Sequence, residues 1–159
     1  MIKRLCIAAG LACAVAVSAL APAVLAQVRE PKDLVGAFYA EANVALAPAR
    51  SDAYLAHDLS AALRADSGAF GRVAAVDFDY RYGVQDLDVS GLDLLQEVDN
   101  DQAKVIAVFK NHGHPESVNW TLCRRADGGW RIADADSNTG RAAWDLRAML
   151  RLPADRIRC

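Results

Sequence analysis

The sequence predicts one small α+β domain, with helices packed on a curved antiparallel sheet and a leader segment in front. Two observations carry this prediction. Apolar residues recur at helical spacing in the first half of the chain beyond the leader, and they alternate with a period of two after residue 77. Helices followed by a run of strands are typical of α+β architecture. A chain of 159 residues has room for a single domain.

Residues 1–26 have the three-part pattern of a secretory signal peptide. Lys3 and Arg4 form a basic start, residues 5–20 are almost wholly apolar, and cleavage is predicted after Ala26. Residues 27–159 then form the domain, in the periplasm or outside the cell, with no stable membrane span after processing. An uncleaved anchor is the alternative, although the apolar run is shorter than the roughly 20 residues that a span requires.

The composition of the segment beyond the leader excludes some partners and predicts a disulfide. Without Lys3 and Arg4 the net charge falls from −2 to −4. We therefore expect no nucleic-acid partner, because such a partner requires a basic face. Cys123 and Cys159 are the two cysteines left after processing. In an oxidising compartment an even pair predicts a disulfide; two independent thiols are the alternative.

Two helices are predicted first. Pro31 suits a first helical turn, and apolar residues recur at helical spacing from there to Leu46, before Pro48. Asp58 is a predicted N-cap for a second helix, which ends at Ser67-Gly68.

About four strands and a short helix follow. The alternation predicts strands near residues 87–98, 105–110, 118–123 and 130–136, separated by turns. Gly91 within the first strand indicates a bulge or bend. Asp127-Gly128-Gly129 is a hairpin signal, because glycine accepts positive φ. The last predicted element is a helix that contains Trp144 and ends before Pro153.

Four segments together resemble a known group of proteins. They are Phe38-Tyr39 in the first helix, Tyr54-Leu55 before the second helix, Asp77-Phe78-Asp79-Tyr80 with Gln85-Asp86, and Gly129-Trp130-Arg131-Ile132-Ala133-Asp134. The pattern resembles an uncharacterised family of small exported bacterial proteins that is similar to the nuclear-transport-factor-2-like superfamily. This resemblance implies a curved sheet that wraps helices into a cone with a pocket. It implies no particular activity.

The densest polar cluster comprises Asp77, Asp79, Gln85 and Asp86. As a functional site, these residues would line the mouth of a pocket and bind a cation or a polar ligand. The cluster lacks the glycine and distal glutamate that a calcium loop has. Turn chemistry, in which aspartate side chains accept hydrogen bonds from nearby backbone N–H groups, is the favoured interpretation.

Asp134 and Asp136 are the carboxylates with a catalytic interpretation. By strand parity they share a face with Trp130 and Ile132, and burial on a concave face would raise the pKa of Asp134. Tyr39, Tyr80 and Trp120 could line the same pocket, although buried aromatic residues are more often simply core. An ion pair or exposure to water is the alternative role for Asp134.

Spacing alone assigns no residue as catalytic or metal-binding, and no cofactor motif is present. His112-Gly113-His114 lacks the further ligands that a zinc site requires. The sequence therefore favours a periplasmic, non-catalytic binding or interaction module for a small molecule or an envelope protein. Its alternatives are a small isomerase or hydrolase that uses Asp134 with Tyr39 or Tyr80, and a periplasmic immunity or inhibitor protein that binds through residues 77–86 or 111–116.

Overall fold

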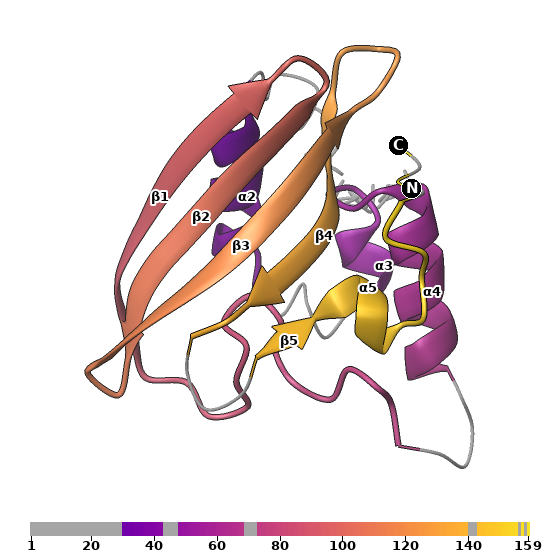
Figure 1. The fold of residues 1–159 in the computed structure, drawn as a ribbon. Helices are drawn as coiled ribbons and strands as arrows, with labels where there is room; N and C mark the ends of the chain where they lie inside the picture. Colours follow the sequence, from indigo (N-terminus) through magenta and orange to yellow (C-terminus); the bar gives the residue numbers. More distant parts are fainter. Residues whose placement is uncertain (1–29, 43–47, 69–72, 140–142, 156, 158) are drawn as a thin grey trace, which may run out of the picture.

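A computed structural model describes residues 30–42, 48–68, 73–139, 143–155, 157 and 159. The predicted leader and its cleavage site lie outside these residues. In chain order the elements are helices α2 (Pro31–Ala40), α3 (Pro48–Ser51) and α4 (His57–Ser67), strands β1 (Val89–Asp99), β2 (Gln102–Asn111), β3 (His114–Arg124), β4 (Trp130–Ser137) and β5 (Trp144–Asp145), and helix α5 (Leu146–Met149) (Figure 1).

The strands form one antiparallel sheet in the order β1-β2-β3-β4-β5. Each strand pairs with the next one in the chain, so the sheet is a meander. The α+β prediction is confirmed, but the sheet has a fifth strand. Trp144 belongs to β5 rather than to the last helix, because Trp144 pairs with Ser137 and Asp145 pairs with Asp136. Helix α5 starts only after Asp145, whose carboxylate accepts the Ala148 N–H at 2.7 Å.

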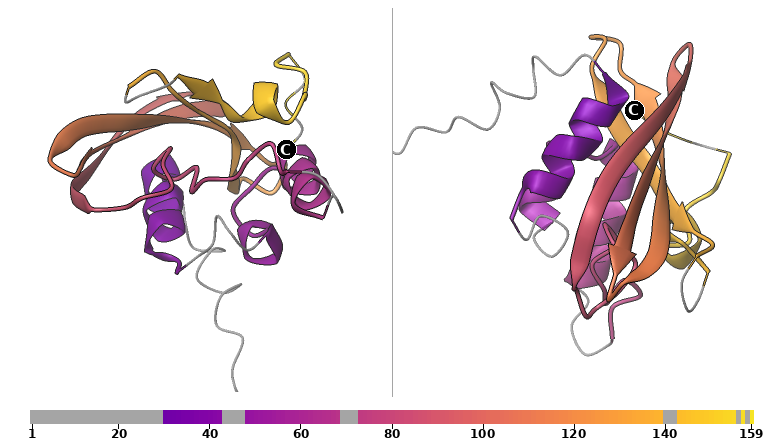
Figure 2. Two further views of the ribbon diagram at one scale, coloured as in Figure 1. Left: turned by 90° about the horizontal axis from the view of Figure 1, so that it is seen from below. Right: turned by 90° about the vertical axis from the view of Figure 1, so that its left-hand side faces the viewer.

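The sheet is curved, and helices lie on both of its sides (Figure 2). Helices α2 and α4 lie on the concave side, whereas α5 lies on the convex side near β4. The main core fills the concave side. Its fully buried members come from the helices, the loop before β1 and the inward side chains of β2 to β4, and the largest of them are Trp120, Tyr80, Phe38, Leu34, Leu59, Leu122 and Ile132.

Two helix boundaries differ from the sequence prediction. Helix α2 ends at Ala40, and the predicted continuation to Leu46 falls partly outside the described residues. Helix α4 has Ala56 as its N-cap, so the prediction of Asp58 in that role is wrong. Asp58 instead lies in the first turn, where its carboxylate pairs with the Arg147 guanidinium at 2.9 Å. The Asp58 side chain, which local propensity would place as an N-cap, is thus paired with Arg147, a residue distant in sequence.

The predicted disulfide is present between Cys123 and Cys159. It joins strand β3 to the last residue of the chain, with 6.0 Å between the two Cα atoms and 36 residues of sequence separation. A crosslink of this span restricts the unfolded chain and is expected to stabilise the fold by about 4 kcal/mol. Ala56, Cys123 and Ala133 form a small second core, against which Ile157 packs.

None of the helices in the described part of the chain is both long enough and apolar enough to span a membrane.

Candidate functional site

The three aromatic residues predicted to line a pocket pack against one another in the core. Trp120 makes edge contacts with Tyr39 and Tyr80, at centroid distances of 5.8 and 6.5 Å. The Tyr39 hydroxyl donates to the Arg81 carbonyl and accepts the Trp120 indole N–H at 3.3 Å. Burial raises the pKa of Tyr39 and of Tyr80 well above the ordinary value. Both phenols therefore stay protonated at neutral pH.

The predicted polar cluster is divided between the interior and the surface. Asp79 is buried and forms an ion pair with Arg81 at 2.7 Å, while the same carboxylate accepts the Arg81 backbone N–H at 3.0 Å. Tyr82 and Gly83 donate their backbone N–H groups to the Asp79 carbonyl, which closes a turn. Asp79 thus has the turn role that the sequence favoured, together with a buried cation that the sequence did not reveal.

Arg81 ties this turn to helix α2. Its guanidinium donates to the backbone carbonyls of Tyr39 at 3.4 Å and Glu41 at 2.7 Å. These carbonyls lie at the C-terminal end of α2, where backbone acceptors lack helical partners. Arg81 therefore donates hydrogen bonds to free carbonyls at the end of α2 and also pairs with the Asp79 carboxylate. These contacts account for its burial as a structural residue.

The remaining polar residues lie on the surface. The Gln85 side chain donates to the Asp77 carbonyl at 3.1 Å, and both residues are exposed. Asp86 lies 3.5 Å from a ring nitrogen of His112. The Asn111 side chain donates to the Asp86 carbonyl, so the loop before β1 is joined to the turn between β2 and β3. The four predicted residues therefore do not converge on one site.

Asp134 and Asp136 lie on the convex face, and the prediction that they share a face with Trp130 and Ile132 is wrong. Strand β4 contains an extra residue relative to β3, because Ile132 pairs with Leu122 whereas Asp134 pairs with Thr121. Such a bulge reverses the side-chain parity that follows it. The sheet therefore separates Asp134 from Tyr39 and Tyr80, so these groups do not surround one cavity.

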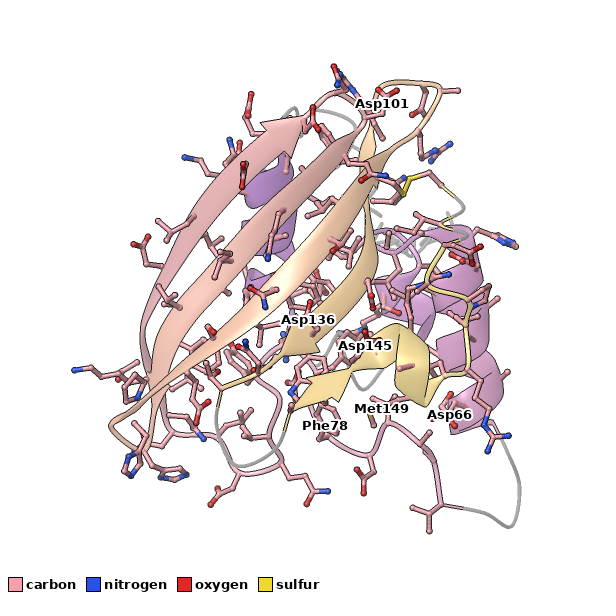
Figure 3. The ribbon with its side chains drawn as sticks, in the orientation of Figure 1. Asp66, Phe78, Asp101, Asp136, Asp145 and Met149 are labelled. Carbon is pink, nitrogen blue, oxygen red and sulfur yellow. A yellow bond between two sulfur atoms is a disulfide. The ribbon has the colours of Figure 1, made fainter. Side chains whose placement is uncertain are left out.

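Asp134 lies in an acidic, half-buried environment. Burial, reinforced by the nearby Asp145 carboxylate, raises the pKa of Asp134 from 3.8 to about 6. Its carboxylate accepts the backbone N–H groups of Ala135 at 2.8 Å and Arg147 at 3.2 Å. Asp136 and Asp145 are partners in the β4–β5 pair and lie near each other in Figure 3. The Asn119 amide donates to Asp136 at 2.8 Å.

Candidate metal ligands occur across the described residues. Within the part of the chain that the structure describes, no group of three or more His, Cys, Asp or Glu side chains is arranged to hold a metal ion. His112 and His114 lie at the exposed turn between β2 and β3, in agreement with the predicted turn at these residues.

The most unusual surface of the molecule is the outer edge of strand β1. This strand has 11 residues, and in the described sheet its only strand partner is β2. Three of its apolar residues remain substantially exposed: Leu92 by 40%, Leu95 by 54% and Val98 by 47%. Long edge strands with exposed apolar residues are uncommon in monomeric proteins, because their unpaired backbone groups recruit other strands.

The two faces of β1 differ in their surroundings. Leu94 pairs with the buried Ala107, so Leu94 and every second residue after it face the helices. Asp93, Leu95 and Glu97 face the convex side. A bulge between Ser90 and Asp93 separates this region from the start of the strand.

An open groove follows β1 on the concave side. It has a volume of about 450 Å³, and its walls are α2 and the middle of β1: Lys32, Asp33, Gly36, Ala37, Leu92, Asp93 and Leu94. Gly36 brings the helix close to the strand, since a Cβ at this position would lie 3.5 Å from Leu94 Cδ1. A further contact between α2 and β1 is a hydrogen bond of 3.0 Å from the Lys32 backbone N–H to the Gln96 side-chain oxygen.

Sequence reasoning did not single out the exposed edge of β1, although a signal was present. The first strand of a meander must lie at an edge, and residues 92–95 contain three leucines that one face of a strand cannot bury together. Arg81 and Arg147 were also missed as buried residues, because an arginine has no sequence pattern that marks burial.

Searches against protein-family models, curated proteins and solved structures gave no match for this chain. A functional proposal for it therefore rests on the sequence and on the geometry described above.

Proposed function

We propose that the chain is an exported, non-catalytic interaction module that binds an extended segment of another polypeptide along the outer edge of β1. The observation that carries this proposal is the exposure of Leu92, Leu95 and Val98 on an edge strand of 11 residues. Strand addition satisfies unpaired backbone groups of an edge and buries apolar side chains beside it. The groove between α2 and β1 would receive side chains of the added strand.

Export is part of the proposal. It is supported by the predicted leader and by the Cys123–Cys159 disulfide, since disulfides persist in oxidising compartments such as the periplasm. The order of helices, meander and last helix also supports the resemblance to the nuclear-transport-factor-2-like superfamily. We propose membership of that group as an account of the curved sheet.

A binding role is favoured over the enzyme hypothesis by the position of Asp134. Its pKa of about 6 would suit a general base, but the carboxylate lies on the opposite face of the sheet from Tyr39 and Tyr80. The Tyr39 hydroxyl is held in the core by the Arg81 carbonyl and the Trp120 indole N–H, and the Tyr80 ring packs against Trp120. The constellation that the enzyme hypothesis needs is therefore absent from the described residues.

Selection from a display library of random extended peptides tests the proposal, with the purified exported chain as the target. Enriched peptides are expected to slow amide hydrogen exchange in Val89–Asp99 and to leave exchange in Trp130–Ser137 unchanged. Gly36→Leu would place a side chain in the groove and should weaken the binding of these peptides. Ala40→Leu, at an exposed position of the same helix, is the matched control. Enriched peptides that protect only other segments would overturn the proposal.

A second candidate is an inhibitor or immunity protein that binds through the loops at the start of β1. It is favoured by one observation: Asn111 and His112 contact Asp86 and Asp88, so two predicted contact regions form one surface. Peptides or proteins that protect residues 85–88 and 111–114 together, without protecting the rest of β1, would support this candidate over edge binding.

A further inference from the structure

The charges of the β1 edge are all of one sign. Asp93, Glu97 and Asp99 lie on the strand and Asp88 lies directly before it, whereas residues 89–99 contain no lysine or arginine. On the neighbouring strand, Lys104 is paired with Glu97 and compensates one acid. Asp93 is paired with Val108 and has no cation opposite to it. The outer edge therefore presents an acidic surface interrupted by apolar residues.

The pairing geometry fixes where these acids lie relative to an added strand. Asp93, Leu95 and Glu97 point to the convex side, so a strand beside β1 would place every second residue opposite them. Two residues of the added strand, four positions apart, would lie opposite Asp93 and Glu97. The residue midway between them would lie opposite Leu95. The alternate residues would point toward the helix side, beside Leu94 and the groove.

A second copy of this chain fits the edge poorly. If two β1 strands paired antiparallel and kept their faces, most registers would place an acid of one copy opposite an acid of the other. If the two strands paired with Leu94 opposite Leu94, no acid of one copy would lie directly opposite an acid of the other. In this register, however, the two Asp93 carboxylates would be diagonal neighbours, and Glu97 would lie opposite the bulge at Gly91. Like charges at these cross-strand positions are destabilising. A heterologous occupant therefore suits the edge better.

We infer that the occupant of the β1 edge is an extended segment of another polypeptide that carries two basic residues four positions apart on its convex face, with apolar residues between them. This inference rests on the proposed function and names the chemistry of the partner. Lysine or arginine opposite Asp93 and Glu97 would neutralise the acidic surface. Apolar residues opposite Leu94 and Leu95 would cover the half-buried Leu94 and the exposed Leu95.

A synthetic peptide of the pattern Val-Lys-Thr-Val-Val-Lys-Thr, with blocked termini, tests this chemistry. Its binding to the full exported chain is measured by fluorescence anisotropy at low and moderate salt, and its position is measured by hydrogen exchange of β1. An acidic peptide with glutamate in place of both lysines serves as the matched probe. The basic peptide is expected to bind more tightly, to lose affinity as salt rises, and to protect Val89–Asp99.

The variant Asp93→Asn/Glu97→Gln removes both charges from exposed positions. We expect it to weaken binding of the basic peptide by about fivefold at low salt, as two exposed charge pairs would. Asp77→Asn/Asp155→Asn changes the net charge equally, away from the edge, and is expected to leave binding unchanged. Equal weakening by both variants would overturn the inference by showing that binding is not local.

The remaining outcomes separate this inference from the proposed function. If the acidic peptide, or the library peptides that protect β1, bind without any preference for basic residues, the partner chemistry is wrong while edge binding stands. If neither the synthetic peptides nor any library peptide protects β1, edge binding itself is wrong and the inference fails with it.

Discussion

The two edges of the sheet are built in opposite ways. The outer edge of β1 is long, exposed and acidic, and its only strand partner in the described sheet is β2. At the other edge, β4 is paired with β5 near Ser137, and its first half forms a bridge with Leu55. Backbone hydrogen bonds of 2.7 and 2.9 Å join Ile132 to Ala56 and Tyr54.

The edge at β4 and β5, here called the closed edge, is further stabilised by a buried ion pair and by a disulfide. Arg147 is almost fully buried and pairs with Asp58, while its guanidinium also donates to the Ala133 and Pro153 carbonyls. The disulfide between Cys123 and Cys159 attaches the end of the chain to the same region. Within the described residues, the bridge, the buried ion pair and the disulfide thus all lie at the β4–β5 side of the sheet, and none of them lies at the outer edge of β1.

The largest expected effect comes from the disulfide. Cys159→Ser should lower the free energy of unfolding by about 4 kcal/mol, because a loop of 36 residues is no longer closed in the unfolded chain. Denaturant unfolding measures the change, and the reduced native protein should match the variant. A loss below about 1 kcal/mol would show that the closed edge does not depend on this crosslink.

Removal of the buried cation should have the next largest effect. Arg147→Ala leaves the Asp58 carboxylate and two backbone carbonyls without their partner, at an expected cost of about 3 kcal/mol. Arg125→Ala is the control, since its ion pair with Asp127 is exposed and should contribute less than about 1 kcal/mol. Similar losses for the two variants in thermal unfolding would remove the distinction between the buried and the exposed pair.

Asp134 is expected to destabilise the closed edge in its charged form. Its pKa is raised in the folded state, so the folded protein binds this proton more tightly than the unfolded chain does. The unfavourable contribution is therefore absent below pH 3.8 and develops as the pH rises toward about 6.

The variant Asp134→Asn keeps an oxygen that accepts the Ala135 and Arg147 N–H groups and removes the charge. Because the carboxylate is only half-buried, we expect a stabilisation of about 1 kcal/mol at pH 7, which disappears near pH 4. Unfolding curves across this pH range provide the measurement, with Asp136→Asn as the control. Stabilisation that is the same at both pH values would contradict the assigned titration.

The smallest effect on stability is expected at the outer edge of β1. Leu95→Thr replaces a residue that is 54% exposed and should change the free energy of unfolding by less than about 0.5 kcal/mol. Val105→Thr, at a fully buried position of β2, should cost about 2 kcal/mol because it buries a hydroxyl. If Leu95→Thr were equally costly, β1 would be part of the core and not a free binding surface.

The order of the elements was readable from the sequence because it depends on local periodicity. The order of helices before strands, the bulge near Gly91 and the turn at Asp127-Gly128-Gly129 all appear in the structure, although the first strand begins only at Val89. The fifth strand was missed because its two residues are too few to show an alternating pattern. The N-cap prediction at Asp58 failed because Arg147, which is distant in sequence, pairs with that carboxylate.

By itself, the sequence determined the fold class, the meander and the pair of cysteines that join, since each depends on composition or on neighbours along the chain. Only the tertiary structure decided which face of the sheet Asp134 takes, because one extra residue at Ile132–Ala133 reverses every later side chain of β4. The tertiary structure also decided that Arg81 and Arg147 are buried and that β1 keeps an open edge. These properties depend on contacts between distant segments, which local patterns do not encode.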